Sequence, residues 1–529
     1  MPVLPKSVLV FGASLQTART ARQVRRKDNG AAAQSLALNQ LLARQAATDF
    51  GHDHGLEPGL RYETFRQRVP LQTYDALLPY LDRMRAGESD VLSPGHGTAF
   101  ATTAGTILGT PKAIPLNAEM IAHFRDTALR ALFCYTARAR DTRVLDGRQL
   151  LLGASTALTP ISSAPFDAHE GPLAGILARH LRPWASHHFL APEISVSDLP
   201  HGPEKTAALA ADAFPRDIRL LAASPNWLLE LAPALLREHA RDGHAASDLA
   251  SIWPHLQVVV HGGSPLTPFR DEVRRFVGRS VEFHEIYACA EGFIAAQDGA
   301  EGEGLHLFTD AGLFFEFIPL ADFFFSTTLE HAGSKAVPLE HVTVGRDYVI
   351  VLTTPAGLTR YVLDDVVRFT STQPPRLVHV GRTPFTLNSL GEMVNERDLT
   401  EALATVCQRH NWSVSHFHVA PLSTSSLTGQ SRGRHEWWLE LKPGTMETPR
   451  GPAIAPELDA ELRPRCAAYD TRRRSGGIEA PLVRLVMPGV FESWMKRQLE
   501  WSPLRKLPRS RPDRSIADEL AAIARFCPE

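Results

Sequence analysis

Short apolar runs that end in small polar residues alternate with helical segments over the middle of the chain. Three of these runs read QLLLGAS, IRLLAAS and LQVVVHGGS, and a helical spacing of leucines lies between two of them, from Trp227 to His239. Continuous apolar runs are typical of strands buried on both faces of a parallel sheet, and helices connect such strands. The pattern predicts an α/β core, in which sites gather at the carboxyl ends of the strands.

Helical spacing also appears closer to the N-terminus. Leucines and alanines recur on one face from Ala32 to Phe50, and Gly51 stands where a C-terminal cap is expected. A second helical segment is predicted from Asn117 to Ala137. The earlier run VLVFGA is too short to cross a membrane, and no G-x-G-x-x-G follows it, so a dinucleotide-binding fold is not favoured.

The pattern changes later in the chain. LFFEFIPL, YVIVLTTPAG and TRYVLDDVVRFTS are longer β-type runs separated by turns, which indicates an antiparallel sheet or a barrel-like part. From about Gly391 the order is strand or turn, helix (Glu396 to Arg409), two strands, helix, strand and helix, with a polar hairpin tip from Ser423 to Arg434. This order predicts a small α+β domain. The predicted domains are residues 1–384 and 385–529.

Composition narrows the class of protein. The 529 residues are 44% hydrophobic and 22% charged, and the formal net charge is only −2, which offers no overall attraction for nucleic acid or an anionic membrane. The five cysteines form no C-x-x-C pair, and their odd number argues against a disulfide framework. We therefore expect a cytoplasmic protein, monomeric or weakly dimeric, that binds neither nucleic acid nor a membrane.

One stretch combines glycines, threonines and a cation. TTAGTILGTPKAIP places Gly105 and Gly109 among threonines, and Lys112 follows. The spacing is not that of a Walker A motif, in which the lysine directly follows the glycine. Small residues nevertheless let backbone N–H groups converge on phosphate oxygens, and threonine hydroxyls add donors. A phosphate-binding loop and a plain polar turn explain these residues equally well.

Two acidic residues stand in β-type surroundings. YACAEG ends a β-like run, and an aromatic residue with a glutamate at a strand end can stack on adenine and hold Mg²⁺, although such a glutamate is usually a solvated turn residue. In RYVLDDVVRF, Asp365 needs a partner, which ribose hydroxyls would supply by charge-assisted hydrogen bonds. The alternative partners are Arg360 and Arg368. Arg382 follows at the apparent domain junction.

The order and spacing of these motifs resemble those of the auxin-responsive (Gretchen Hagen 3) acyl acid amido synthetases, which are part of the adenylate-forming superfamily. The resemblance covers almost the entire chain, from AAAQSLALNQLLARQAATDFG through YETFRQRVPLQTYDALLPYLDRMRAGE, SPNWLLEL, WPHLQVVVHGG and YACAEGF to KLPRSRPDRS. It implies a large N-terminal domain that binds ATP and the acyl acid, and a small mobile C-terminal lid domain.

The resemblance also implies a reaction in two steps that requires ATP and Mg²⁺. A small carboxylic acid attacks the α-phosphate of ATP to give an acyl-adenylate, and an amine or amino acid then displaces AMP to form an amide. Tyr287 would lie against the adenine, Glu291 would bind Mg²⁺, and Asp365 would hold the ribose. Lys506 would contact the α-phosphate and move with the small domain about a hinge at Arg382. The residues expected around the β- and γ-phosphates are Thr103, Gly105, Thr106, Gly109 and Lys112.

The acyl pocket is expected between the central helices and the strand ends. Trp227 also has a structural interpretation as a core residue, and His261 as a strand-end histidine. The 22 histidines show no paired spacing beside carboxylates that would indicate a metal cluster. The candidate acid-binding residues are Ser224, Trp227, His261, Gly262, Gly263 and Ser264.

The chain departs from the usual pattern of this family at four positions. Serine is usual at the positions of Ala104, Ile107 and Ala290, and a lost hydroxyl donor to a charged phosphate costs on the order of 1.5–3 kcal/mol. Asp364 stands where glycine is usual, and aspartate is one of the few residues that tolerate positive φ. Besides an amide-forming ligase, two alternatives remain: an acyl-coenzyme A ligase with the same first step, and an impaired nucleotide- or acid-binding protein.

Overall fold

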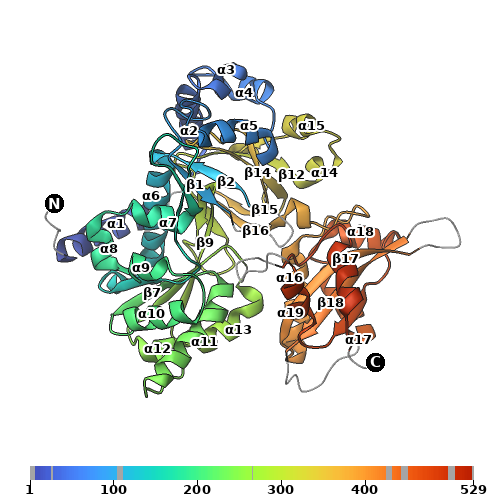
Figure 1. Cartoon of the computed structure of the whole chain (residues 1–529). Coiled ribbons are helices and arrows are strands. Elements are labelled where there is room, and N and C mark those ends of the chain that lie inside the picture. Colours follow the sequence, from blue (N-terminus) through green and yellow to red (C-terminus); the bar gives the residue numbers. More distant parts are fainter. Residues whose placement is uncertain are drawn as a thin grey trace. The chain divides into compact units, whose positions relative to one another are not determined.

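The computed structural model (Figure 1) contains two compact units. The larger unit contains Met1–Ala104, Pro111–Leu363 and Arg368–Val378, and the smaller contains Asp364–Val367 and His379–Glu529. The predicted boundary between residues 384 and 385 stays a prediction. No helix among the described residues is both long and apolar enough to cross a membrane. The structure describes residues 6–24, 28–103, 111–264, 266–424, 432–442, 451–498 and 507–526.

A mixed sheet of twelve strands forms the core of the fold. The strands predicted from the apolar runs QLLLGAS, IRLLAAS and LQVVVHGGS pair in parallel, as expected, and the later β-type runs continue the sheet with antiparallel pairs. The strand order is β13 (Val337–Pro338), β12 (Phe314–Pro319), β14 (Asp347–Thr353), β15 (Tyr361–Thr372), β16 (Pro375–Arg382), β11 (Leu305–Leu307), β10 (Gly292–Ala296), β9 (Glu282–Cys289), β8 (Val258–His261), β7 (Ile218–Ala222), β3 (Arg148–Leu151) and β6 (Leu190–Ala191).

A second sheet of four strands carries the start of the glycine- and threonine-rich stretch. Its strands run in the order β2 (Ala113–Leu116), β1 (Ala99–Thr102), β5 (His169–Pro172) and β4 (Thr159–Pro160). Strands β1 and β2 are antiparallel, with Thr102 opposite Ala113, so the last residue of β1 and the first residue of β2 lie side by side.

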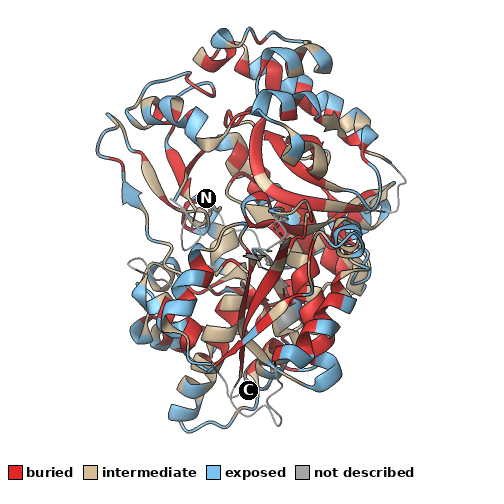
Figure 2. Cartoon of the chain, turned by 90° about the vertical axis from the view of Figure 1, so that its right-hand side faces the viewer, coloured by how far each residue is buried: buried red, intermediate tan, exposed pale blue. Residues whose placement is uncertain are grey.

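Helices cover the large sheet, and Figure 2 shows its strands buried while the outer faces of the helices are exposed. One apolar cluster joins Leu132 and Tyr135 of a long helix to Leu220 and Val258 of the strands. The helices of the larger unit are α1 (Lys6–Val24), α2 (Ala31–Gln45), α3 (Asp49–Asp53), α4 (Tyr62–Arg68), α5 (Tyr74–Arg85), α6 (Ala118–Ala139), α7 (Leu173–Arg179), α8 (Pro183–Phe189), α9 (Ile194–Ser197), α10 (Pro203–Ala213), α11 (Pro225–Arg241), α12 (Leu249–Ile252), α13 (Arg270–Val277), α14 (Leu320–Phe325) and α15 (Leu329–Ser334).

The prediction for Gly51 is wrong. Gly51 lies inside α3 instead of capping α2, because Thr48 begins a new helix by accepting the Gly51 N–H at 3.0 Å. A Cβ atom at Gly51 would lie 1.9 Å from the Gln45 carbonyl oxygen. Gly51 is therefore required for the close approach of two successive helices, a contact that local spacing does not reveal.

The smaller unit has the predicted α+β order. Strands β17 (Val414–Thr424) and β18 (Arg432–Leu441) are antiparallel, and β19 (Leu482–Val486) adds to β18 in parallel. The tip of the predicted hairpin lies outside the described residues. An apolar core lies between this sheet and its helices, with Val406, Trp437 and Leu458 among its fully buried members. The helices are α16 (Glu396–His410), α17 (Gly451–Leu462), α18 (Ala467–Arg474), α19 (Val490–Arg497) and α20 (Ser515–Ile523).

Candidate active site

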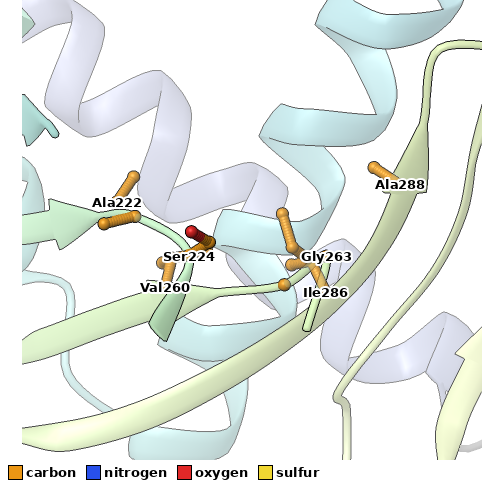
Figure 3. Close-up of a pocket in the computed structure, with 8 residues that line it drawn as sticks. Ala222, Ser224, Val260, Gly263, Ile286 and Ala288 are labelled. Atoms are coloured by element: carbon orange, nitrogen blue, oxygen red, sulfur yellow. The ribbon is translucent and has the colours of Figure 1, made fainter. Parts of the chain in front are cut away.

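A cavity of about 250 Å³ lies at the carboxyl ends of β7 and β8, beside β9 (Figure 3). Its walls are formed by small and aliphatic side chains, and the Ser224 hydroxyl is the one polar side-chain group in this lining. The position agrees with the general rule that ligands of parallel sheets bind at strand ends. The lining residues are Ala222, Ala223, Ser224, Val260, Gly262, Gly263, Ile286 and Ala288.

Strand alternation decides which predicted residues reach this cavity. Val260 lines it, so the next side chain, His261, lies on the other face of β8, where its ring meets the edge of Phe283 at 5.9 Å. Burial lowers the pKa of His261 to about 4. The structure thus brings together Ser224, Gly262 and Gly263 of the predicted set, whereas His261 belongs to the opposite face.

The two other predicted acid-binding residues also lie outside the cavity lining. Trp227 is 7% exposed and packs edge-on against His201 at 4.9 Å, as its interpretation as a core residue predicts. The buried Ser264 hydroxyl has no hydrogen-bond partner among the described residues.

Ser224 is the N-cap residue of α11, but its side chain makes no capping hydrogen bond. Its hydroxyl and the start of α11 are therefore both at the cavity.

Strand β9 carries the next two predicted residues. Tyr287 lies between Ile286 and Ala288, which both line the cavity, so its ring occupies the opposite face of the same strand. Glu291 follows in the short turn between β9 and β10 and is 6% exposed. One strand thus links the cavity wall, the candidate adenine-binding ring and the candidate metal ligand.

A histidine that the sequence analysis did not single out holds the turn after Glu291. His123 of α6 donates from Nδ1 to the Ala311 carbonyl at 2.7 Å and accepts the Phe293 N–H at Nε2 at 3.0 Å. These two bonds require the neutral ring, and burial lowers the pKa of His123 in agreement. A lone histidine on an apolar helix face gives no indication of this role in the sequence.

No group of three or more metal-ligating side chains occurs among the described residues. This is compatible with Mg²⁺, which is commonly held by one or two carboxylates together with substrate phosphates. Glu291, a carboxylate at the end of β9, is a ligand of the required chemical kind, and the remaining oxygens would come from the nucleotide and water.

Thr103 and Lys112 close the base of the predicted phosphate loop. The Thr103 hydroxyl accepts the Lys112 N–H at 3.0 Å, and the Thr103 N–H donates to the Lys112 carbonyl at 2.9 Å. The Lys112 ammonium donates to the Tyr361 hydroxyl at 3.0 Å and lies 5.7 Å from the centre of the Tyr74 ring. The predicted residues Gly105, Thr106 and Gly109 lie outside the described residues.

In the smaller unit, Asp365 has ion-pair partners, but neither is one of the two arginines considered as the alternative to ribose. Its carboxylate lies 3.1 Å from Arg382 Nε and 3.6 Å from His379 Nε2. Arg368 lies three residues after Asp365 in β15, so its side chain points to the other face of the strand, and Arg360 precedes the strand. They pair instead with other carboxylates, at 3.0 Å between Arg360 and Glu316 and 2.6 Å between Arg368 and Asp347.

Asp364 adopts the left-handed conformation expected of a glycine replacement. Its φ is 67°, and its carboxylate accepts a hydrogen bond from the Thr383 hydroxyl at 3.0 Å. The prediction that aspartate can stand here in place of glycine is therefore confirmed, and the hydrogen bond adds a contact that glycine cannot make.

Lys506 lies outside the described residues, but the segment that follows it is firmly attached. His418 Nδ1 donates to the Pro508 carbonyl at 2.7 Å, and the Val419 N–H donates to the Arg509 carbonyl at 2.8 Å. The Arg509 N–H in turn donates to Glu396 Oε1 at 3.0 Å. This segment is therefore part of the folded smaller unit, bound to β17 and to the start of α16.

Comparison with known families gives three matches in chain order. Residues 19–160 match the GH3 family N-terminal domain, residues 306–382 match the GH3 family central domain, and residues 397–504 match the GH3 family C-terminal domain. Together these matches cover more than half of the chain.

Two curated relatives show the activities found among similar proteins. An indole-3-acetic acid-amido synthetase, GH3.8 of Oryza sativa subsp. indica, is 24% identical over 88% of this chain and 85% of its own length. A jasmonoyl–L-amino acid synthetase, GH3.3 of Oryza sativa subsp. japonica, is 26% identical over 61% of this chain and 80% of its own length.

Solved structures share the fold. An acyl acid amido synthetase, AtGH3.15 in complex with 2,4-DB, has a TM-score of 0.74 at 16% identity and covers 99% of this chain and 98% of its own. A 2-hydroxyisobutyryl-CoA ligase in the postadenylation state has a TM-score of 0.55 at 14% identity, with 94% and 93% covered. The expected fold and the expected class of enzyme, an amide-forming ligase, are confirmed. The chain belongs to the GH3 family.

Proposed function

We propose that this enzyme uses ATP and Mg²⁺ to adenylate a small, largely apolar monocarboxylic acid and then joins the acyl group to an amine or amino acid. The observation that carries the proposal is the continuity of β9. Ile286 and Ala288 face an apolar cavity, Tyr287 lies on the other face of the strand, and Glu291 follows directly after it. Acid, adenine and metal would thus be aligned along one element.

The cavity suits an acid without a second charge. A dry apolar cavity of about 150 Å³ holds a benzene molecule, so about 250 Å³ accommodates a ring with a short side chain. The lining offers one hydroxyl, that of Ser224, and no charged group. The acid's own carboxylate would lie toward the start of α11, where the helix dipole favours a negative charge.

In the first step a carboxylate oxygen attacks the α-phosphorus, the bond from that phosphorus to the bridging oxygen breaks, and pyrophosphate leaves. An anion approaches a polyanion in this step, so positive charge near the phosphates stabilises the transition state. Bound Mg²⁺ would supply charge and orient the leaving group. Glu291 would hold it, while Thr103 and Lys112 would fix the two ends of the phosphate loop.

The ribose of the nucleotide would be held by Asp365. Asp365 forms an ion pair with Arg382 at 3.1 Å, and a carboxylate is the kind of group that accepts charge-assisted hydrogen bonds from ribose hydroxyls. In the second step the amine nitrogen attacks the acyl carbon, the bond from that carbon to the AMP oxygen breaks, and the nitrogen gives up a proton. No nucleophilic side chain is needed in either step, because the phosphate ester already activates the acyl carbon.

The proposal is tested by measuring pyrophosphate release with a panel of monocarboxylic acids, with amines, amino acids or coenzyme A supplied separately. We expect release with ring-bearing acids that fit the cavity, and an amide product when an amine or amino acid is present. A thioester product would assign the chain to the acyl-coenzyme A ligases instead. Tight ATP binding without pyrophosphate release for any acid would show an impaired enzyme.

The role of Lys506 is tested by Lys506→Ala, compared with Lys496→Ala. Lys496 is an exposed lysine of α19 that pairs with Glu492. We expect Lys506→Ala to slow single-turnover adenylation by at least about tenfold, roughly 1.4 kcal/mol of transition-state stabilisation. Lys496→Ala should leave the rate unchanged, and equal rates in both variants would remove Lys506 from the mechanism.

A further inference from the structure

The first helix exposes an apolar stripe to solvent. Val8, Phe11 and Leu15 of α1 are 54%, 67% and 51% exposed, and their spacing of three and four residues places them on one face. Figure 1 shows α1 at the edge of the larger unit, beside α6. An exposed apolar face is unfavourable in water unless something covers it.

The opposite face of α1 already has its partner. Val10 and Ala13 pack against the cluster between α6 and the sheet, and the Thr17 hydroxyl is 2.8 Å from the Thr136 hydroxyl of α6. The helix is therefore held in place by its inner face. The stripe of Val8, Phe11 and Leu15 is not needed for this packing.

The exposed stripe continues with positive charge. Arg19 and Arg22 follow Leu15 at the same spacing, both are exposed, and no described carboxylate forms an ion pair with either. Arg25, Arg26 and Lys27 come next in the sequence, and the first 27 residues contain no aspartate or glutamate. The near-neutral charge of the whole chain thus conceals a strongly basic N-terminal segment.

We propose that α1 binds the surface of a membrane that contains anionic phospholipids. Val8, Phe11 and Leu15 would enter the boundary between headgroups and acyl chains, and Arg19 and Arg22 would contact lipid phosphates, as in helices that lie in the membrane interface. A second copy of the chain is a poorer occupant, because pairing two such helices would bring many cations together without a carboxylate. This surface is independent of the proposed catalytic function.

The test is sedimentation of the full-length protein with vesicles of phosphatidylcholine alone or with about a third phosphatidylserine. We expect binding to the anionic vesicles at low salt, at least about tenfold weaker binding to neutral vesicles, and loss of binding as salt rises. Failure to bind anionic vesicles at low salt would overturn the proposal.

Two double variants and one control separate the contributions. Phe11→Glu with Leu15→Glu should weaken vesicle binding by at least about tenfold, and Arg19→Gln with Arg22→Gln should reduce the preference for anionic lipid. Val344→Glu changes a residue of similar exposure, 52%, in a distant turn and should bind normally. All three should keep the thermal midpoint of the parent, because the changed side chains are exposed. Vesicle binding unaffected by the first variant, or self-association abolished by it, would contradict the proposal.

Discussion

Polar groups have opposite surroundings in two regions of the molecule. The first region is the cavity at the strand ends of the larger unit, and the second is the charged cluster of Asp365, Arg382 and His379 in the smaller unit. Around the cavity the walls are apolar, and the nearby buried histidines His261 and His284 are held neutral by burial. In the smaller unit, the Asp365 carboxylate lies 3.1 Å from Arg382 and 3.6 Å from His379. An acyl-adenylate has the same two halves, an apolar acyl group and a charged nucleotide. The acyl group of the proposed intermediate would therefore bind in the apolar cavity, and its nucleotide would bind beside charged residues.

The two regions also require different kinds of residue. An apolar cavity between close-packed strands requires small residues, and a Cβ at Gly262 would lie 2.5 Å from the Ile286 carbonyl oxygen. A charged cluster requires partners instead, because an unpaired buried charge is strongly unfavourable. Changes of size should therefore act on the first region and changes of charge on the second.

The largest effect is expected for Glu291→Gln, which tests whether the strand that lines the apolar cavity also carries the metal ligand. Loss of a carboxylate ligand should slow adenylation by about 100-fold or more and raise the Mg²⁺ concentration needed for half-maximal rate. Single-turnover pyrophosphate release at varied Mg²⁺ measures both. Glu282→Gln, at the other end of β9, is the control. An unchanged Mg²⁺ dependence would exclude Glu291 as the ligand.

Asp365→Asn should have the next largest effect, because it removes charge from the second region. A charge-assisted hydrogen bond contributes about 1.5–3 kcal/mol, so the KM for ATP should rise by about 10- to 100-fold while the KM for the acid changes little. Asp347→Asn removes a similarly paired carboxylate, that of the Arg368 ion pair, and should leave both values near the parent. A rise in the KM for the acid without a rise in the KM for ATP would show that Asp365 contacts the acid and not the nucleotide.

The neutral histidines of the first region predict a dependence of stability on pH. Burial lowers the pKa of His284 to about 3, with the nearby Arg138 acting in the same direction, and burial lowers the pKa of His261 to about 4. From pH 6.5 down to about 4 the unfolded chain therefore binds protons that the folded chain does not, and stability falls with falling pH. Each histidine contributes up to about 1.4 kcal/mol per pH unit.

Replacing one of these histidines isolates its share. His284→Leu should flatten the loss of urea-unfolding free energy in this range by up to about 1.4 kcal/mol per pH unit. His284 is fully buried beside Tyr135 at 5.7 Å, so the apolar replacement also removes two ring nitrogens from a dry environment. A slope identical to that of the parent would show that His284 is not held neutral.

The smallest effect is expected for Ala288→Leu, which tests whether the volume of the apolar cavity limits the size of the acid. The larger side chain would fill part of the cavity, and overpacking costs at least about 1 kcal/mol, so the KM for the largest acids should rise about fivefold. The KM for ATP and the rate with the smallest acids should stay near the parent values. Equal effects on small and large acids would argue that the acid binds elsewhere.

Local pattern was sufficient for most of the fold. The parallel strands β7 and β8 and the helices α6 and α11 lie where apolar runs and helical spacing place them, because these elements bury a face that the sequence displays directly. Gly51 shows the limit. Its role depends on the distance to a carbonyl of the preceding helix, and that distance is set by tertiary packing.

The site was predicted less completely, because it depends on which face of a strand each residue occupies. His261 and Val260 are neighbours in sequence, yet one lines the cavity and the other does not. The alternative to a ribose contact for Asp365 was an ion pair with arginines close in sequence, whereas the charged side chains beside it come from the next strand. Knowing the register of neighbouring strands would have corrected both predictions. The bonds of His123 follow from no sequence pattern.

The left-handed backbone at Asp364 has a consequence for how this site can change over time. Codons for aspartate and glycine differ by a single base, and both residues satisfy the geometry found here. Exchange between them is therefore a short mutational step that leaves the shape of the chain intact. The two residues differ at this position only in the negative charge of aspartate and in the hydrogen bond that its carboxylate accepts from Thr383, so selection would act on these two properties.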